Sequence, residues 1–333
     1  MTSRFRFLAV LLPCLLWVCA CGGDAGSAPG AMRLGFVVKQ PEEPWFQLEW
    51  RFAEVAEREL GFELVKIGAS DGERVLAAID TLAARSAAGF VICTPDVRLG
   101  PTIAAQARAK GMKLLAVDDR FLGADGKPMQ DVHYLGVSAR EIGEEVGRAL
   151  VAEKERRGWP SDGLGVCVVT FDELDTARER TEGAVAALRE LGIPDERIFS
   201  APERAPEIPA ALDAVDVLLT RHGTIRRWLV CGMNDNSVLG AVRALEGRGF
   251  AADDVIAIGI NGTDCIDELR KPGKTGFHGS MLLSAKEHGH RTISMLHTWC
   301  KDGVEPPLDT RTTGVLITRE NFEAVLREQG ITR

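Results

Sequence analysis

Five short clusters of polar residues each follow an apolar run of the sequence, and their side chains could bind a small ligand rich in hydroxyl groups. The clusters are Lys39-Gln40-Pro41-Glu42-Glu43, Asp118-Asp119, Asp172-Glu173, Asn234-Asp235 and Asn261-Gly262-Thr263-Asp264. Carboxylates and amides exchange hydrogen bonds with hydroxyls, and a lysine adds a charge-assisted donor. A single cluster of this kind usually caps a helix or forms a turn. Five of them in one chain favour a binding site.

Two aromatic residues, Trp45 and Phe46, come shortly after Glu43 and could form one wall of such a site. A sugar ring has apolar C–H faces as well as hydroxyls, so a receptor for it combines polar groups with an aromatic surface. Core packing on the first helix is the alternative role for these two residues, and the sequence leaves both open. Together the polar and aromatic residues predict a site for a sugar-sized molecule.

The chain that must position these clusters alternates short β-branched runs with longer amphipathic segments from Met32 onward. This alternation is typical of parallel sheets with crossover helices. A first series has predicted strands at residues 33–38, 63–67, 89–93, 113–117 and 132–137, with helices at 45–60, 72–86 and 102–110. A helix at 141–156 opens a second series, with strands at 165–170, 215–219, 228–232 and 255–260. The predicted fold class is therefore α/β, with two doubly wound parallel-sheet domains.

The end of the chain adds a segment of a different kind. Pro306 and Pro307 precede residues 308–318, which we expect to cross between the domains, and a last helix is expected from Arg319. Ligands of such sheets bind at the carboxyl ends of parallel strands. The polar clusters lie at those ends, so the topology would bring them together.

The N-terminus has the pattern of a secretory signal peptide over residues 1–20. Arg4 and Arg6 give a positive start, residues 7–18 are apolar, and small residues precede the cleavage point. The sequence VCACG at 18–22 resembles the lipobox of bacterial lipoproteins, which implies that Cys21 carries lipid and that residues 21–31 form a tether. A secreted protein with an incidental cysteine at that place remains open. The expected location is the periplasm, anchored to a membrane by lipid.

The composition of the chain limits the kinds of partner that the protein is expected to have. The 333 residues are enough for two domains, and loss of Arg4 and Arg6 with the signal would change the net charge from −8 to about −10. This acidic balance argues against nucleic acid as a partner. Five cysteines would remain besides Cys21, and their spacings match no metal pattern and no disulfide framework. We expect no metal and no cofactor.

Seven stretches of the chain resemble the L-arabinose-binding proteins of the type I periplasmic sugar-binding family. They are GFVVKQPEEPWFQ (35–47), GFVICTPD (89–96), AVDDRF (116–121), ELDTARER (173–180), GMNDNSVLG (232–240), IGINGTD (258–264) and VLITRENF (315–322). The similarity covers the chain from Met32 to about Gly330. It implies two lobes joined by three crossing segments near residues 136–139, 280–283 and 312–317. The N-terminal lobe would comprise 32–137 and 283–313, and the C-terminal lobe 138–282 and 314–333.

The resemblance also implies a function. The protein would be a monomeric, non-enzymatic substrate-binding lipoprotein that binds L-arabinose or a related monosaccharide between its lobes. It would deliver that sugar to the membrane permease of an ATP-binding-cassette (ABC) importer. The lobes would close around the ligand by a hinge motion.

Site residues in the N-terminal lobe follow from the same resemblance. Lys39 and Glu43 would bond ring hydroxyls, Trp45 and Phe46 would pack on the ring, and Cys93 would line the pocket. Asp118 would hold a charged network, and Asp119 would accept a hydrogen bond from the anomeric hydroxyl in either configuration.

The implied residues of the C-terminal lobe are Leu174, Thr176, Arg180, Met233, Asn234, Asn261 and Asp264. Arg180 would bind the ring oxygen and a neighbouring hydroxyl, with Leu174 and Thr176 beside it. Asn234 and Asn261 would complete the hydroxyl shell, and Met233 would contact the sugar. Asp264 would orient Asn261 or Arg180.

One position departs from the family, because Val137 stands where the family has a methionine in the first crossing segment. The resemblance places it near the sugar carbon that distinguishes a pentose from a hexose. A shorter side chain leaves room for a larger substituent, so D-galactose and D-fucose are further candidate ligands.

Two other classes of protein fit the sequence less well. A carbohydrate-active enzyme could use paired carboxylates, but His222, His278, His288 and His290 form no nucleophile or metal motif. The chain also lacks a G-x-S-x-G elbow and a phosphate loop. A sugar-responsive repressor would need a helix-turn-helix before the first strand, where the predicted signal and tether lie.

Overall fold

The computed structural model describes residues 31–331. The predicted signal peptide, Cys21 and the tether up to residue 30 lie outside the described residues. Within residues 31–331, no helix has both the length and the apolar composition needed to span a membrane.

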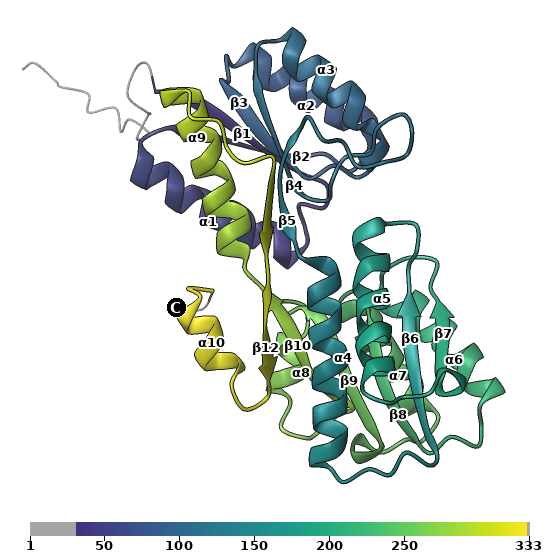
Figure 1. Cartoon of the computed structure of the whole chain (residues 1–333). Helices are drawn as coiled ribbons and strands as arrows, with labels where there is room; N and C mark the ends of the chain where they lie inside the picture. The colour runs from purple at the N-terminus through teal and green to yellow at the C-terminus, as the bar shows by residue number, and fades with distance from the viewer. Residues whose placement is uncertain (1–30, 332–333) are drawn as a thin grey trace, which may run out of the picture.

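The first of two sheets has six parallel strands in the order β11-β5-β4-β3-β1-β2. The strands are β1 (Arg33–Val38), β2 (Glu63–Gly68), β3 (Gly89–Ile92), β4 (Lys113–Asp118), β5 (His133–Val137) and β11 (Asp309–Thr312). Helices α2 (Gly72–Ala84) and α3 (Gly100–Ala109) cover one face, and α1 (Pro44–Leu60) and α9 (Thr292–Asp302) cover the other (Figure 1). Strands buried on both faces account for the continuous apolar runs of the sequence.

The second sheet repeats this plan in the order β12-β10-β9-β8-β6-β7. Its strands are β6 (Leu164–Thr170), β7 (Ile198–Pro202), β8 (Arg227–Gly232), β9 (Val255–Asn261), β10 (Phe277–Leu283) and β12 (Gly314–Thr318), and only β12 runs antiparallel. The covering helices are α4 (Ala139–Arg156) and α5 (Asp175–Glu190) on one face and α6 (Ile208–Arg221) and α7 (Asp235–Gly247) on the other. Two parallel-sheet α/β domains confirm the predicted fold class.

The chain passes between the two sheets three times (Figure 1). It crosses from β5 to α4, returns after β10 into a π-helical turn, η4 (Glu287–Arg291), and crosses again between β11 and β12. Leu283, which the sequence placed in the first lobe, pairs with Gly314 in the second sheet. The second passage therefore lies at residues 284–286, after the predicted segment 280–283.

One predicted strand is wrong. Residues 215–219 lie within α6, because a short apolar run fits a strand and a buried helical stripe equally well. Ala211, Val215 and Leu218 are buried at helical spacing, while Val217 is 54% exposed. The second strand of this domain in chain order is instead β7, which the sequence analysis did not predict. It lies at the sheet edge and ends in Pro202, a position where proline is tolerated.

Close helix packing fixes the position of α5 beside the cleft. A Cβ atom on Gly143 of α4 would lie 2.0 Å from the carbonyl oxygen of Arg180, and one on Gly183 of α5 would lie 2.2 Å from that of Arg140. Only glycine allows backbones to approach so closely. The two contacts set the height and rotation of α5, which carries Arg180.

Candidate functional site

A bridge of polar groups joins the two lobes at the carboxyl ends of the strands. Lys39, after β1, donates from Nζ to Oδ2 of Asp119 at 2.7 Å. Thr176, at the start of α5 in the other lobe, donates from Oγ1 to Oδ1 of the same carboxylate at 2.9 Å. Burial alone would lower the pKa of Lys39, but the charges of Asp119 and Asp118 and the Cys93 thiol raise it above its ordinary value. Lys39 is therefore a permanent cation.

Asp118 is the second carboxylate of this group, and several donors hold it. Its Oδ1 lies 2.6 Å from Nδ1 of His288, and its Oδ2 accepts from Nε1 of Trp45 at 3.3 Å. Burial would raise the pKa of Asp118, but the His288 hydrogen bond and the charges of His288 and Lys39 outweigh it and lower the pKa. Asp118 is thus an anion in a buried place.

The backbone at Asp118 is left-handed, with φ of 62°. A non-glycine residue in this region costs free energy unless its surroundings hold it. Here Tyr134 donates from its hydroxyl to the carbonyl oxygen of Asp118 at 2.6 Å. Asn261, at the end of β9 in the other lobe, also has a positive φ, of 109°. Strained residues therefore end one strand on each side of the cleft.

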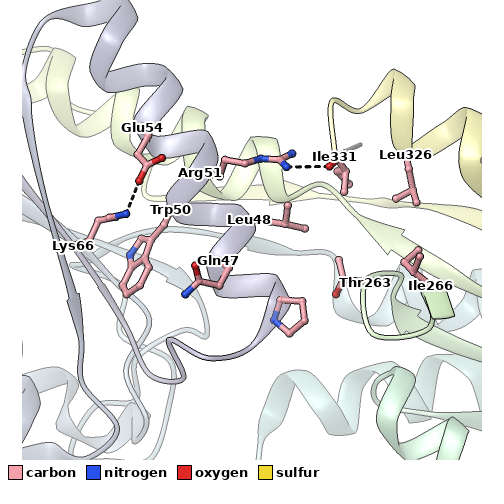
Figure 2. Close-up of a pocket in the computed structure, with 11 residues that line it drawn as sticks. Gln47, Leu48, Trp50, Arg51, Glu54, Lys66, Thr263, Ile266, Leu326 and Ile331 are labelled. Carbon is pink, nitrogen blue, oxygen red and sulfur yellow. Dashed lines mark hydrogen bonds and ion pairs between the residues drawn. The ribbon is translucent and has the colours of Figure 1, made fainter. Parts of the chain in front are cut away.

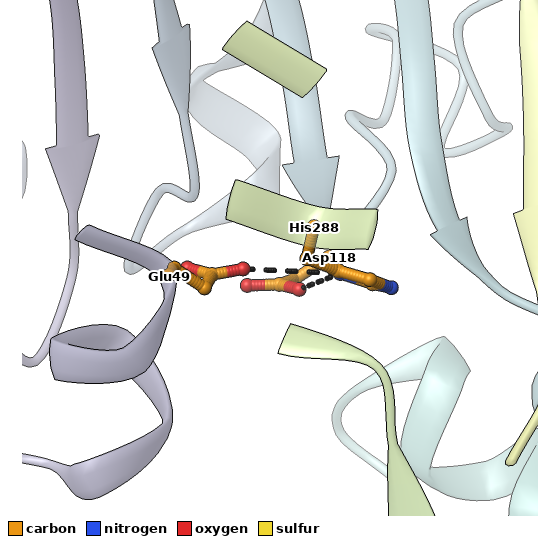
Figure 3. Close-up of side chains that lie close together, drawn as sticks. All are labelled: Glu49, Asp118 and His288. Atoms are coloured by element: carbon orange, nitrogen blue, oxygen red, sulfur yellow. Dashed lines mark hydrogen bonds and ion pairs between the residues drawn. The ribbon is translucent and has the colours of Figure 1, made fainter. Parts of the chain in front are cut away.

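Glu49, Asp118 and His288 form a tight cluster whose ligand atoms all lie within 4.8 Å of one another (Figure 3). Nε2 of His288 lies 2.9 Å from Oγ1 of Thr312, which itself donates to the carbonyl of Gly136. Both ring nitrogens of His288 are thus engaged in hydrogen bonds. The ring has no nitrogen left for a metal ion, so the cluster fits hydrogen bonding rather than metal binding.

Glu49 completes this cluster as a neutral acid. Its side chain is fully buried, and neither carboxyl oxygen has a hydrogen-bond partner within normal geometry among the described residues. Burial, followed by the nearby charge of Asp118, raises the pKa of Glu49 well above the usual range. A neutral Glu49 avoids placing a second anion against Asp118.

Arg180 enters the cleft from α5. Its Nη1 donates to the carbonyl oxygen of Met233 at 2.7 Å and to Oδ1 of Asn261 at 3.5 Å. Within residues 31–331 no ion pair joins Arg180 to Asp264, which the resemblance expected to orient Asn261 or Arg180. Burial lowers its pKa, while the charges of Asp119 and Asp118 oppose that effect. Its Nε is buried without a partner, so the guanidinium retains a free donor.

Asn234 caps α7 and lies beside Arg180's partner Met233. Its Oδ1 accepts from the backbone N of Ser237 at 2.8 Å, and its Nδ2 donates to the carbonyl of Pro206 at 3.2 Å. The neighbouring Asp235 accepts from the backbone N of Gly262 at 2.9 Å. Asp235 thereby holds the loop that begins at the strained Asn261.

Two further acids, one in each lobe, lie near enough to influence each other. Glu43, the last residue before α1, has a raised pKa because of its burial and the nearby charges of Asp264 and Glu207. Burial likewise raises the pKa of Asp264 in the second lobe. Glu43 makes no side-chain hydrogen bond to another described residue, which leaves it available to a ligand.

The remaining candidate residues are apolar or weakly polar. Trp45 is 6% and Phe46 is 3% exposed, and Cys93 is fully buried with Sγ 3.8 Å from Oδ2 of Asp119. Val137 and Met233 are buried, and Leu174 is half-buried at the start of α5. The third polar cluster, Asp172 and Glu173, is exposed, and no side-chain hydrogen bond among the described residues joins it to the other clusters.

The sequence missed Glu49, Tyr134, His288 and Thr312. Glu49 could have been found, because it lies on the same helical stripe as Trp45, Phe52 and Ala56, all buried. His288 had no such signal, since its role depends on how η4 packs against α1. In that contact, a Cβ on Gly289 would lie 2.2 Å from the carbonyl oxygen of Glu49.

A separate cavity of about 530 Å³ lies on the side of the molecule where α1 meets the short helices α8 (Ile266–Arg270) and α10 (Phe322–Glu328) (Figure 2). Arg51 reaches across it and donates to the carbonyl oxygen of Ile331 at 3.0 Å. Apart from Thr263 of the last polar cluster, the lining residues include none of the candidate site residues. This cavity is a second place where the lobes touch.

The fold and site define a class of protein, a two-lobed receptor that encloses a polar ligand at the carboxyl ends of parallel strands. The family model "Periplasmic binding proteins and sugar binding domain of LacI family" matches residues 31–324, and the chain belongs to that family.

Two relatives are close in sequence. The L-arabinose-binding periplasmic protein of Escherichia coli (strain K12) is 50% identical over 301 residues, which cover 90% of this chain and 92% of the relative. The ABC transporter L-arabinose-binding periplasmic protein of Azospirillum brasilense is 44% identical over 331 residues, 99% of each chain. The chain is accordingly a periplasmic binding protein and not an enzyme, which sets aside the carbohydrate-active alternative.

Solved structures show the same fold at low sequence identity. A periplasmic ribose ABC transporter protein from Conexibacter woesei superposes with a TM-score of 0.75 at 20% identity, over 93% of this chain and 100% of that one. An arabinose-binding protein from Geobacillus stearothermophilus gives a TM-score of 0.72 at 16% identity, over 89% and 99%.

The neutral state of Glu49 can be tested by stability. Glu49→Gln should change the free energy of unfolding in urea by less than about 1 kcal/mol at pH 7, whereas Asp118→Asn should cost about 3 kcal/mol because it strands buried cations. A raised carboxyl pKa means that the folded state binds more protons, so stability falls as pH rises above about 4.5. Glu49→Gln should remove that part of the fall. Equal losses in the two variants would show that Glu49 is ionised.

Proposed function

We propose that this protein binds L-arabinose or a closely related monosaccharide between its lobes and delivers it to the membrane permease of an ABC importer. The observation that carries the proposal is the bridge Lys39–Asp119–Thr176, because it places a buried carboxylate with donors from both lobes at the strand ends. Two relatives of 44% and 50% identity are named for L-arabinose binding, which supports this choice of sugar.

Each lobe would supply a different part of the ligand shell. In the first lobe, Asp119 would accept from the anomeric hydroxyl, Lys39 and Glu43 would bond ring hydroxyls, and Trp45 and Phe46 would cover an apolar face of the ring. Cys93 would line the pocket beside them, and Asp118 would keep the network charged. Mixed polar and aromatic surfaces of this kind suit sugars.

The second lobe would complete the shell on closure. The free Nε of Arg180 supports its role as donor to the ring oxygen. Asn234 and Asn261 would bond hydroxyls, Asp264 would orient Asn261, and Leu174, Thr176 and Met233 would pack around the ligand. The three passages between the lobes support a hinge motion that opens and closes the site.

The cellular setting is also part of the proposal. We infer a lipid anchor on Cys21 that holds a monomeric receptor at a membrane facing the periplasm, with a tether to residue 31. The lipobox-like sequence at 18–22 supports this inference. Two or more acyl chains would give a firm attachment.

Arg180→Ala provides the main test of the site. It would remove the free Nε donor proposed for the ring oxygen, so the affinity for L-arabinose should fall by about 3 kcal/mol, or roughly a hundredfold. Calorimetric titration measures the affinity, and circular dichroism confirms the fold.

Arg189→Ala, on the exposed side of the same helix, is the matched control and should bind normally. An unsubstituted protein whose melting temperature is not raised by any pentose or hexose would contradict the function itself. Near-normal affinity in Arg180→Ala would contradict the site.

Val137 should loosen the choice of sugar. D-galactose or D-fucose should bind within about tenfold of L-arabinose, a difference of about 1.4 kcal/mol, because valine fills less of the subsite than methionine would. Titration of all three sugars on Val137→Met should then show stronger preference for the pentose. A preference above a hundredfold that the substitution leaves unchanged would exclude Val137 as the determinant.

The anchor is tested by labelling cells with radioactive fatty acid. The unsubstituted protein should incorporate label and sediment with membranes, and Cys21→Ser should do neither, since that thiol is the proposed acylation site. Label that persists in Cys21→Ser would place the lipid elsewhere.

A further inference from the structure

A buried acid that the proposed site does not use contacts Ser237, the serine that also contacts Asn234. Glu203 follows β7 and is 6% exposed. Its backbone N donates to the carbonyl of Thr170 at 3.0 Å, which ties it to the end of β6. Its Oε1 lies 2.5 Å from Oγ of Ser237, while its Oε2 is buried without a partner among the described residues.

The hydroxyl of Ser237 lies between Glu203 and Asn234, the residue proposed to bind a sugar hydroxyl. Its Oγ lies 2.8 Å from Oδ1 of Asn234, so it touches two oxygens at hydrogen-bond distance. The amide orientation of Asn234 is fixed independently, because the backbone N of Ser237 also donates to Oδ1 at 2.8 Å. Both neighbours of the hydroxyl are therefore acceptors if Glu203 is ionised.

A proton count decides between the two states of Glu203. A serine hydroxyl has one hydrogen and cannot donate to both oxygens at full strength. If Glu203 is protonated, it donates to Ser237 Oγ and the serine donates to Asn234, which satisfies both short contacts. An ionised Glu203 would also bury an unpartnered anionic oxygen, which is costly. The two short contacts of Ser237 Oγ favour the protonated acid.

We propose that Glu203 is a positioning residue for sugar binding, which in its protonated form orients Asn234 through Ser237 and releases it on ionisation. This inference rests on the proposed role of Asn234 as a hydroxyl ligand. Loss of the proton would draw the serine hydrogen to the carboxylate and leave Oγ and Oδ1 as two facing acceptors. The amide would then shift from the position that Ser237 and Pro206 define.

The environment of Glu203 keeps its titration near neutrality. Burial raises its pKa to about 7, against a smaller opposing effect of the Ser237 hydrogen bond. The charged groups on adjacent elements are otherwise engaged or exposed. Arg204 pairs with Asp213 of α6, Asp235 of α7 bonds Gly262 and Ser280, and Asp172 after β6 is exposed.

The test is a calorimetric titration of the full soluble chain with L-arabinose between pH 5.5 and 8.5. In the unsubstituted protein the affinity should be highest below pH 6 and fall by about fivefold through pH 7, the change expected from losing one neutral hydrogen bond. Glu203→Gln keeps a donor toward Ser237 at every pH, so its affinity should match the low-pH value and stay flat. Ser237→Ala removes the hydroxyl that links Glu203 to Asn234. This variant should bind L-arabinose more weakly, and its affinity should not change as Glu203 ionises.

Glu196→Gln, an exposed acid just before β7, is the matched control and should keep the full pH profile. A flat profile in the unsubstituted protein, or the same step in Glu203→Gln, would overturn the proposal. The unfolding free energy of the ligand-free protein supplies a readout that needs no sugar. A raised acid pKa makes stability fall as pH rises from about 4.5 to 7, and Glu203→Gln should lose that fall.

The two readouts separate this inference from the function on which it rests. If no sugar binds at any pH, the proposed function fails, while the stability profiles still report the proton on Glu203. If sugar binds but Glu203→Gln changes neither profile, only the positioning role fails.

Discussion

The balance of buried charge at the strand ends is the constraint on which the rest of the structure depends. Lys39 forms an ion pair with Asp119, His288 lies 2.6 Å from the Asp118 carboxylate, and all four side chains lie mostly out of solvent. An unpaired charge in such a place costs several kcal/mol. The ends of β1, β4 and η4 must therefore meet within hydrogen-bond distance, which fixes the geometry of the first lobe. The second lobe contributes Thr176, which donates to Asp119, and the cation Arg180. The same charges therefore also favour contact between the lobes.

The backbone accepts strain to maintain this arrangement. Asp118 and Asn261 both have positive φ, and each is held by other groups, Asp118 by Tyr134 and the Asn261 loop by Asp235. Strained residues usually occur where the surrounding structure over-determines them, often at functional sites. Here the positive φ angles direct the carboxylate of Asp118 and the amide of Asn261, which come from opposite lobes, toward the same site. A relaxed strand end would point them elsewhere.

The sequence was informative wherever topology dictated the outcome and uninformative where packing did. Polar residues after parallel strands had to converge, so the clusters at Lys39, Asp118, Asn234 and Asn261 could be predicted to form one site. The resemblance to a known family supplied their individual roles. The helix at 208–221 was mistaken for a strand because its apolar run is short enough to fit either period. His288 and Thr312 could not be predicted, since their contact joins segments that meet only when η4 and β11 have packed.

The interleaved course of the chain has a consequence for how the molecule is made. Residues 33–137 contain five of the six strands of the first sheet, but its edge strand β11 and its covering helix α9 come from residues 292–312. During synthesis, more than 150 residues are therefore added after β5 before α9 can cover its part of one apolar face of the first sheet. Contacts between segments so far apart in sequence form slowly, and the incomplete lobe cannot reach its final stability early. The first lobe can therefore complete its packing only after residues 292–312, near the end of the chain, have been synthesised.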